Sequence, residues 1–338
     1  MKIAIIAVVS SRGETGGAER FYKGLTNAFN AAGAEADLIE IIGDESNFAA
    51  IEETYLRFYD LNVAHYDGVI STKAPSYLVR HTNHLCYLVH TMRVFYDMFE
   101  REFHEPTREL LEQRAFIRTL DTAALSPKRV KKIFSIGHEV AKRLREYNSL
   151  DSDVLHPALL FDDFKADAYG DYLFMPGRLH RWKRVDLVIQ AMRYVKSPIK
   201  LKIAGTGEDE ETLRNMARHD ARIEFLGRVD DVKLMELYAN SLAVSFTPQR
   251  EDYGYVTLEA FKSKKSVITC VDSGEPTYFI KDSFNGFVCA PDPIEIADKI
   301  DFLFHNRSKA EEMGSNGHRS ISHITWDNIV NKLMKALG

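Results

Sequence analysis

Short apolar runs alternate with amphipathic stretches along the whole chain, which is the pattern of a parallel α/β protein. In the first half this pattern predicts six strands, at residues 2–9, 36–42, 68–72, 85–90, 132–136 and 154–155. Longer stretches at residues 18–32 and 105–125 have helical character and lie between these strands. The first half therefore predicts one doubly wound sheet.

A second alternation follows the polar, poorly periodic stretch 160–170, which is the best linker candidate. It predicts strands at residues 172–176, 199–204, 222–226, 242–246, 267–270 and 287–290. Val185, Val188, Met192 and Val195 fall on one face of its first helix, and residues 326–337 form an amphipathic helix. We expect two Rossmann-like domains, 1–163 and 164–321, followed by a C-terminal segment 322–338. Ligands of such domains bind where the strands end, here in a cleft between two domains that face each other.

Composition places the chain among ordinary globular proteins. Its 338 residues suggest about two domains, and a net charge of −5 gives no general nucleic-acid signature. Cys86, Cys270 and Cys289 have no CxxC spacing and lie in apolar runs, so we expect buried free thiols in a reducing compartment. The apolar run 3–9 is too short for a signal peptide, and no run approaches a bilayer-spanning length. We expect a cytoplasmic protein.

The most informative motif is a pair of acidic residues, Glu251 and Glu259, on either side of Gly254. The pattern places Glu251 on a loop and Glu259 in the first turns of a helix over 256–262. Gly254 leaves backbone N–H groups uncovered at that helix N-terminus, where a phosphate can bind. Acidic acceptors beside an anion site favour a nucleotide sugar. The spacing alone is also compatible with one dipole-stabilised Glu and one solvated Glu.

Two basic residues, Arg178 and Lys183, stand between the first strand and the first helix of the second half. Together they could neutralise a diphosphate, Arg as a planar fork and Lys as a point charge. The alternative is a solvated basic turn, since Arg181 and Arg184 lie in the same segment.

The first half opens with a strand, a glycine-rich turn with Gly13, Gly16 and Gly17, and a helix. This arrangement presents backbone N–H groups to phosphate, although G-x-x-G-G differs from the dinucleotide pattern. Glu40 at the end of the second strand could mimic the ribose-binding acid of an NAD site, so a dehydrogenase stays open here. A flexible turn with a helix cap is the simpler alternative.

Three further features carry possible chemistry. His90 ends an apolar run and could bond a sugar hydroxyl or a reacting group, or be structural. Asp151-Ser-Asp153 matches the D-x-D of metal-dependent sugar transferases, but it lies beside the linker among turn residues, so we expect no metal there. The stretch 126–146 is rich in Lys and Arg and could dock on anionic lipid, or be a solvated face.

The order of these motifs resembles the retaining glycosyltransferases of family 4, the group 1 glycosyltransferases, which have the GT-B fold. The motifs are Gly16-Gly17-Ala-Glu19, His90, Gly177-Arg178 with Lys183, Ala204-Gly-Thr-Gly-Glu208, Phe225-Leu-Gly-Arg-Val229 and Glu251-x7-Glu259. The resemblance covers the whole chain and is strongest from residue 172 to about residue 290. It implies an N-terminal acceptor-side domain, a nucleotide-sugar-binding domain, and a C-terminal helix that crosses back onto the first domain.

The resemblance also implies roles for the charged residues. Arg178 and Lys183 would bind the donor diphosphate, Glu259 the ribose hydroxyls, and Glu251 the transferred sugar. His90 matches the catalytic-site histidine that lies near the donor sugar.

Backbone contacts follow from the same resemblance. Gly254, Tyr255 and Val256 would contact sugar and phosphate, and Arg228 and Val229 would line the base pocket. Gly16 and Gly17 would close on the phosphates from the other domain. Residues 273–276, Ser-Gly-Glu-Pro, depart from the Gly-Gly pair of many members.

The implied activity is that of a hexosyltransferase in polysaccharide biosynthesis. It would move a sugar with retention from a UDP- or GDP-sugar to a hydroxyl of a glycan, glycolipid or small acceptor. We expect a front-face path with no protein nucleophile, no cofactor and no metal. The tetrapeptide from His90 to Arg93 gives a slight lean to GDP-mannose. A sugar-nucleotide epimerase of the same fold and a non-catalytic sugar-nucleotide-binding subunit stay open, as do a lipid-linked acceptor and peripheral membrane contact at the inner face.

Overall fold

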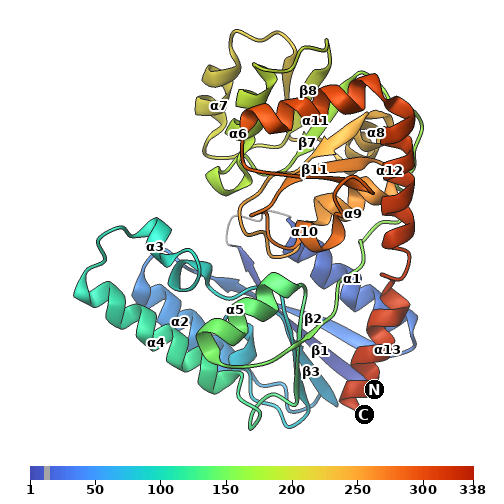
Figure 1. Cartoon of the computed structure of the whole chain (residues 1–338). Helices are drawn as coiled ribbons and strands as arrows, with labels where there is room; N and C mark the ends of the chain where they lie inside the picture. Colours follow the sequence, from blue (N-terminus) through green and yellow to red (C-terminus); the bar gives the residue numbers. More distant parts are fainter. Residues whose placement is uncertain (11–15) are drawn as a thin grey trace. The chain divides into compact units, whose positions relative to one another are not determined.

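The computed structural model describes residues 1–10 and 16–338, and the chain divides into two compact units (Figure 1). Unit 1 contains Met1–Leu160 together with Ile324–Gly338, and unit 2 contains Phe161–His323. Each unit is built around its own parallel sheet of six described strands.

The sheet of unit 1 has the strand order β2-β1-β3-β4-β5-β6, and every pairing is parallel. The strands are β1 (Lys2–Ser10), β2 (Glu35–Gly43), β3 (Gly68–Ser71), β4 (His84–Leu88), β5 (Lys132–Ser135) and β6 (Asp153–Val154). β3 and β4 are buried along their whole length, which explains why their sequences read as continuous apolar runs. The order reverses between β1 and β3, the position where doubly wound sheets bind ligands.

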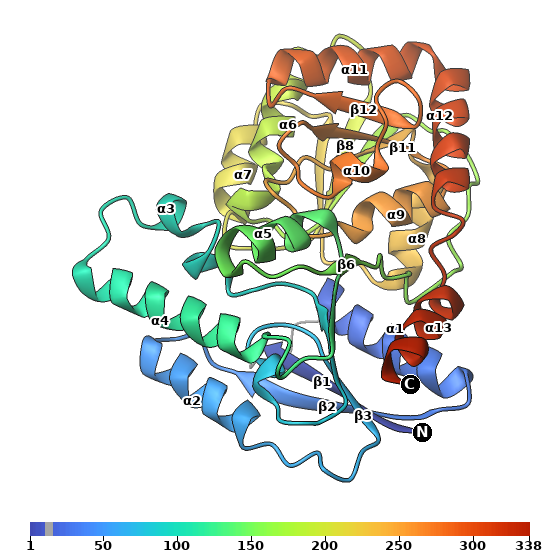
Figure 2. The ribbon, with the colours of Figure 1, turned by 60° about the horizontal axis from the view of Figure 1, so that its bottom comes forward.

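The helices of unit 1 are α1 (Gly17–Ala31), α2 (Phe48–Tyr59), α3 (Phe99–Glu102), α4 (Arg108–Ala124), α5 (His138–Asn148) and α13 (Trp326–Leu337), with 3₁₀ turns η1 (Ser76–Leu78) and η2 (Arg93–Phe95). α13 comes from the end of the chain and lies beside α1 (Figure 2). A Cβ at Gly24 of α1 would lie 2.4 Å from the ring of Trp326, whose Nε1 donates to the Leu159 carbonyl at 2.8 Å. The absent side chain at Gly24 therefore makes room for the indole of α13.

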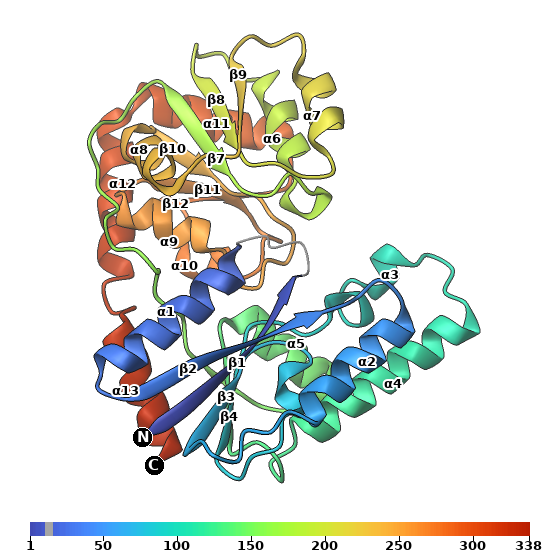
Figure 3. The same ribbon diagram turned by 180° about the vertical axis from the view of Figure 1, so that it is seen from behind.

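The sheet of unit 2 has the order β12-β11-β10-β7-β8-β9 and is also parallel throughout. Its strands are β7 (Tyr172–Pro176), β8 (Lys200–Ala204), β9 (Ile223–Gly227), β10 (Ala243–Ser245), β11 (Ser266–Cys270) and β12 (Gly286–Cys289). Its helices are α6 (Val185–Met192), α7 (Glu210–Ala217), α8 (Asp231–Asn240), α9 (Tyr255–Lys262), α10 (Pro276–Phe279), α11 (Pro293–His305) and α12 (Arg307–Ser320), with η3 at Arg181–Lys183. α6 and α11 lie side by side and share a core with the sheet (Figure 3).

The twelve predicted strands all correspond to observed strands, with ends that differ by at most two residues. One difference concerns the site: β4 ends at Leu88, so His90 lies in the loop after the strand rather than at its end. Helix α6 ends at Met192, so Val195, although buried, lies beyond the helix on which the sequence placed it. The three cysteines are buried and free, as predicted.

The predicted linker has no regular secondary structure, but it is bonded along unit 2. The Asp167 and Ala168 amides donate to the Ala239 carbonyl, and Lys265 Nζ donates to the Ala168 carbonyl at 2.5 Å. Tyr169 Oη donates to the Lys264 carbonyl at 2.7 Å. Among the described residues, none of the helices has the length and apolar character to cross a membrane.

Candidate functional site

Three loops of unit 2 lie around the predicted donor-site residues Arg178, Lys183, Glu251 and Gly254, and the first two of these loops carry them. The three loops follow β7, β10 and β11, which are neighbours in the sheet, and they all leave from its carboxyl edge. The first loop contains Arg178 and Lys183, and the second contains Glu251 and Gly254. Parallel pairing is what brings these segments, about 70 residues apart in the chain, to one place.

Lys183 and Glu251 form a direct ion pair. Lys183 Nζ lies 2.5 Å from Glu251 Oε2, and both side chains are largely covered, 29% and 20% exposed. The ammonium also lies 5.6 Å from the ring centroid of Phe246, within range of a cation–π contact. The structure therefore brings together one basic and one acidic residue that the sequence predicted for the same ligand.

Arg178 points to a different acidic partner. Its Nε lies 3.7 Å from Glu208 Oε2, and His180 Nε2 lies 3.3 Å from Glu208 Oε1. Burial is the main cause that lowers the pKa of His180, with the Glu208 charge opposing it. Glu208 belongs to the predicted Gly-Thr-Gly-Glu motif after β8, so this motif supplies the carboxylate beside Arg178.

Glu259 is buried in the second turn of α9, with only 7% of its surface exposed. One oxygen of its carboxylate, Oε2, accepts a hydrogen bond from Tyr238 Oη at 2.6 Å. Tyr238 is fully buried and meets Phe164 and Phe174 edge to face. Sequence reasoning missed Tyr238, because nothing in the pattern of α8 distinguishes it from any other core tyrosine.

Gly254 is the N-cap of α9 and has a left-handed backbone, with φ of +80°. A Cβ at this position would lie 2.6 Å from the Phe246 ring, so both the conformation and the space call for glycine. Tyr255 and Val256 begin α9, and their amides are among the N–H groups without partners inside the helix. The Tyr255 side chain is buried, and burial followed by the Glu259 charge raises its pKa. The helix start has the form that the sequence predicted for an anion site.

Arg228 and Val229 lie between β9 and α8, directly after Gly227. Arg228 is exposed, and Val229 is partly covered. They leave the same edge of the sheet as the three loops, one strand beyond β8.

The remaining predicted residues belong to unit 1. Gly16 is the N-cap of α1, its amide donates to Glu19 Oε2 at 2.8 Å, and Gly17 is the first residue of the helix. Gly13 of the same turn lies outside the described residues. His90 Nδ1 lies 2.8 Å from the Thr91 carbonyl. Because a carbonyl only accepts, Nδ1 carries the proton, and Nε2 is the acceptor atom of the neutral imidazole.

The acidic pair near the linker binds basic side chains. Asp151 lies 2.6 Å from Arg145, and Asp153 lies 2.6 Å from Lys132. Both carboxylates therefore have protein cations as partners.

Most basic side chains of the stretch 126–146 bond other groups of unit 1. It runs through β5 and into α5, and five of its seven basic side chains bond within unit 1. These are Arg129 to the Leu78 carbonyl, Lys131 to the Leu337 carbonyl, Lys132 to Asp153, Arg143 to Asp97, and Arg145 to Asp151. Lys131 and Lys132 also line a surface groove with Lys332 and Lys335 of α13. Membrane contact through this stretch stays a prediction.

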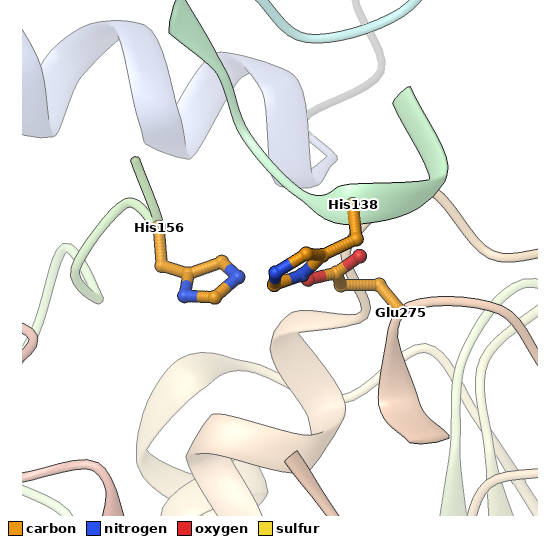
Figure 4. A group of neighbouring side chains, drawn as sticks. All are labelled: His138, His156 and Glu275. Atoms are coloured by element: carbon orange, nitrogen blue, oxygen red, sulfur yellow. The ribbon is translucent and has the colours of Figure 1, made fainter. Parts of the chain in front are cut away.

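Two histidines that the sequence did not single out lie close together in unit 1. His138 begins α5 and His156 follows β6, and their ring centroids are 5.5 Å apart (Figure 4). Zinc sites use three or four protein ligands, so the two imidazoles alone do not make one.

Comparison with known proteins agrees with the fold. Sucrose-phosphate synthase from Thermosynechococcus elongatus superposes with a TM-score of 0.79 at 15% identity, over 99% of this chain and 97% of that one. Anabaena Alr3699/HepE, solved in complex with UDP and glucose, gives 0.74 at 13% identity, over 100% and 99%. WaaG, a glycosyltransferase involved in lipopolysaccharide biosynthesis, gives 0.74 at 14%, over 99% and 100%. The prediction of two Rossmann-like domains of the GT-B type is confirmed, and the cleft between them stays a prediction.

Comparison of the sequence with curated proteins finds glycosyltransferases as relatives. Human alpha-1,3/1,6-mannosyltransferase ALG2 is 26% identical over 208 residues, 52% of this chain and 50% of that protein. The poly(ribitol-phosphate) alpha-N-acetylglucosaminyltransferase of Staphylococcus aureus is 32% identical over 146 residues, 41% of this chain and 29% of that protein. The chain thus spans about half or less of the length of these relatives.

A family model for glycosyl transferases group 1 matches residues 161–320. These residues are nearly the whole of unit 2, and they contain the three loops, with Lys183 and Glu251, and helix α9, with Glu259. Unit 2 of this chain therefore belongs to the group 1 glycosyl transferases.

Proposed function

We propose that the protein is a retaining glycosyltransferase of family 4 that moves a hexosyl group from a nucleotide sugar to a hydroxyl group. The main observation behind this proposal is the ion pair between Lys183 and Glu251. This pair lies beside the N-terminus of α9, in a domain that matches the group 1 glycosyl transferases. A cation and helix N–H groups suit a diphosphate, and carboxylates suit sugar hydroxyls. One site thus offers partners for both halves of a nucleotide sugar.

In this proposal the diphosphate takes over Lys183 from Glu251. The 2.5 Å ion pair holds the ammonium in place before the donor arrives. A donor phosphate then competes for the same ammonium, and Glu251 becomes available to a hydroxyl of the transferred sugar. Glu259, further along α9, accepts hydrogen bonds from the ribose.

Cleavage of the sugar–phosphate bond leaves negative charge on the nucleoside diphosphate. Lys183, Arg178 and the N–H groups at the start of α9 would stabilise that charge. The acceptor hydroxyl attacks from the face that the leaving group vacates, and its proton passes to the leaving phosphate oxygen. Glu251 and Glu259 are thereby contacts to the donor rather than an acid and base pair. The path needs no metal and no cofactor.

The first unit would supply Gly16 and Gly17 at the start of α1 and His90 after β4. His90, whose Nδ1 donates to the Thr91 carbonyl, would then lie near the donor sugar, as the family resemblance implies. Closure of the two units on the donor would exclude water and so limit hydrolysis.

The donor nucleotide is UDP or GDP in this proposal, with mannose as the favoured sugar. Human ALG2 is named a mannosyltransferase, while Alr3699/HepE was solved with UDP and UDP-glucose. The acceptor is a glycan or glycolipid, in line with a second relative from Staphylococcus aureus, which is named a capsular polysaccharide biosynthesis glycosyltransferase. A cytoplasmic location suits a nucleotide-sugar donor.

Calorimetric titration with UDP and GDP tests the donor site. Lys183→Ala or Glu259→Ala should weaken binding of the preferred nucleotide at least about tenfold, since each removes a charge-assisted contact. Lys233→Ala is the matched control, because Lys233 pairs only with Glu236 on the exposed face of α8 in the contacts that the structure gives. Unchanged affinity in both site variants would exclude this donor site.

Donor turnover separates transfer from related chemistry. A thermal-shift screen of UDP-, GDP-, dTDP- and ADP-sugars identifies the donor, and turnover is then followed with and without an acceptor glycan. A transferase releases nucleoside diphosphate faster when an acceptor is present. Epimerisation of the donor in heavy water without acceptor, or tight binding with no turnover of any donor, would overturn the proposal.

A further inference from the structure

Arg184, directly after the proposed diphosphate ligand Lys183, has an unusual backbone. Its φ is +50°, in the left-handed region that residues other than glycine seldom adopt. The side chain is only 14% exposed, so the alternative of a solvated basic turn is wrong for this residue. An unfavourable backbone at a covered arginine suggests that the guanidinium is held by the surrounding structure.

The Arg184 guanidinium joins all three loops of the candidate site. Its Nε and Nη2 donate to the Thr247 and Pro248 carbonyls, each at 2.8 Å, in the loop after β10. Its Nη1 and Nη2 also donate to the two oxygens of Asp272, after β11, at 2.8 and 2.6 Å. This planar fork, with two bonds to one carboxylate, is a geometry that Lys cannot reproduce.

Backbone hydrogen bonds continue from the same contacts to Glu251. The Gln249 amide donates to the Trp182 carbonyl at 2.7 Å, and the Arg250 amide donates to the Asp272 carbonyl at 2.9 Å. The Glu251 amide then donates to the Ser273 carbonyl at 2.9 Å. A continuous series of hydrogen bonds thus connects the backbone of Glu251, opposite Lys183, with the groups that Arg184 binds, which are Asp272 and the carbonyls of residues 247 and 248.

We propose that Arg184 is a positioning residue for the donor site, which fixes the Lys183–Glu251 pair by clamping the loops after β7, β10 and β11. The inference rests on the proposed function, because the ligand for which these loops are arranged is the nucleoside diphosphate part of the donor. The Arg184 guanidinium donates its hydrogen bonds to protein carbonyls and to Asp272. It therefore acts through Lys183 and Glu251 rather than by contacting the nucleotide sugar.

Unit 2 contains a matched control for this clamp. Arg222, just before β9, pairs with Asp220 at 2.7 Å and donates to the Val195 and Ser197 carbonyls at 2.9 and 3.1 Å. It therefore also joins a carboxylate to loop carbonyls, but the loop it holds follows α6 and lies outside the proposed donor site.

The test compares Arg184→Lys, Arg184→Gly and Arg222→Lys in the full chain. Titration with the preferred nucleotide, UDP or GDP, should show about tenfold weaker binding or more for both Arg184 variants, and a change within about twofold for Arg222→Lys. Arg184→Gly also removes the backbone strain, because glycine adopts positive φ without cost. A loss of affinity in that variant without a lower melting temperature separates positioning from general stability.

Amide hydrogen exchange provides a readout without ligand. Exchange at residues 249–251 should become faster in both Arg184 variants and stay unchanged in Arg222→Lys. Wild-type affinity in Arg184→Gly, an equal loss in Arg222→Lys, or unchanged exchange at 249–251 would each overturn the inference. If the wild-type protein binds no nucleoside diphosphate, the proposed function fails and the donor role of Arg184 fails with it. If amide exchange at residues 249–251 were nevertheless faster in the Arg184 variants, Arg184 would hold the loops in place without a role in nucleotide binding.

Discussion

At the scale of single residues, the two acidic residues of the motif have different surroundings. Glu251 lies on a loop and bonds Lys183, whereas Glu259 is buried in α9 and bonds Tyr238. A carboxylate whose oxygen is held by a buried hydroxyl has a fixed orientation, which suits a ligand with two neighbouring hydroxyls such as ribose. The proposed ribose contact is therefore held by a buried hydroxyl, whereas the proposed sugar contact is held by Lys183, which the donor diphosphate would take over.

Tyr238→Phe tests the fixed orientation of Glu259. The variant keeps the edge-to-face packing with Phe164 and Phe174, but it removes the hydroxyl that donates to Glu259. We expect about fivefold to tenfold weaker binding of the preferred nucleoside diphosphate, and a smaller preference for it over its 2′-deoxy form. The measurement is calorimetric titration with both ligands.

Tyr172→Phe is the control for that experiment. The Tyr172 hydroxyl donates to the Leu237 carbonyl at 2.7 Å, so its loss removes a bond of similar length near the same helix and leaves Glu259 alone. Equal affinities in Tyr238→Phe and the wild-type protein would show that the hydrogen bond from Tyr238 to Glu259 does not contribute to nucleotide binding.

At the scale of helices, a buried carboxylate joins several elements of unit 1. Asp121 of α4 is fully buried and accepts hydrogen bonds from Tyr55 of α2 at 2.9 Å and from Tyr96, after η2, at 2.7 Å. Asn148 at the end of α5 donates to the same Tyr96 hydroxyl at 3.2 Å. Burial raises the pKa of Asp121 to about 6, although these tyrosine hydroxyls act to lower it.

This raised pKa predicts a pH-dependent stability of unit 1. Between the ordinary pKa of 3.8 and about 6, the folded protein holds a proton that the unfolded chain releases. The contribution of Asp121 to the free energy of unfolding therefore falls as the pH rises through this window, by up to about 3 kcal/mol. Asp121→Asn cannot ionise, so its stability should rise relative to the wild-type protein from pH 4 to pH 7.

Urea unfolding of both proteins across that pH range provides the measurement. Asp60→Asn, at the exposed end of α2, is the control for the loss of a surface carboxylate. A constant difference between Asp121→Asn and the wild-type protein would mean that Asp121 ionises as an ordinary carboxyl group.

At the scale of the whole molecule, each unit has its own sheet and core, and the end of the chain completes the first unit. α13 buries Ile329, Val330, Leu333 and Leu337 and is separated in sequence from the rest of unit 1 by all of unit 2. Trp326 fills the space above Gly24 of α1. The stability of unit 1 thus depends on the last 15 residues of the chain, 324–338.

Leu333→Ala tests this dependence. Loss of a fully buried leucine should reduce the stability of unit 1 by about 2–5 kcal/mol, while unit 2 keeps its own core. Amide hydrogen exchange resolved by segment should show weaker protection in residues 16–160 and unchanged protection in residues 161–323. Lys332→Ala, at the exposed neighbouring position, should leave both segments unchanged. Equal loss of protection in both units would show that they unfold as one.

Much of the architecture was predictable because parallel α/β domains have a strong local signal. Strands buried on both faces read as apolar runs, and the alternation of apolar runs with amphipathic stretches located twelve strands, including the less buried β2 and β9. The start of α9 just after Gly254 was also predictable, because a helical stretch follows a breaker and a glycine, whereas the left-handed backbone of Gly254 was not predicted. The group 1 assignment of unit 2 depended on several such motifs in one order.

The rest could not be read from local pattern, because it depends on contacts between segments far apart in the chain. Nothing around Tyr238 or Arg184 marks the first as the partner of Glu259 or the second as a clamp on Asp272. The sequence by itself determined the two sheets, the position of the loops and the residue types available for a nucleotide sugar. The tertiary structure decided the pairing of Lys183 with Glu251 and the buried bonds that orient them. Hydrophobic periodicity is local, whereas the partner of a polar group is set by the strand order that brings distant loops to one edge.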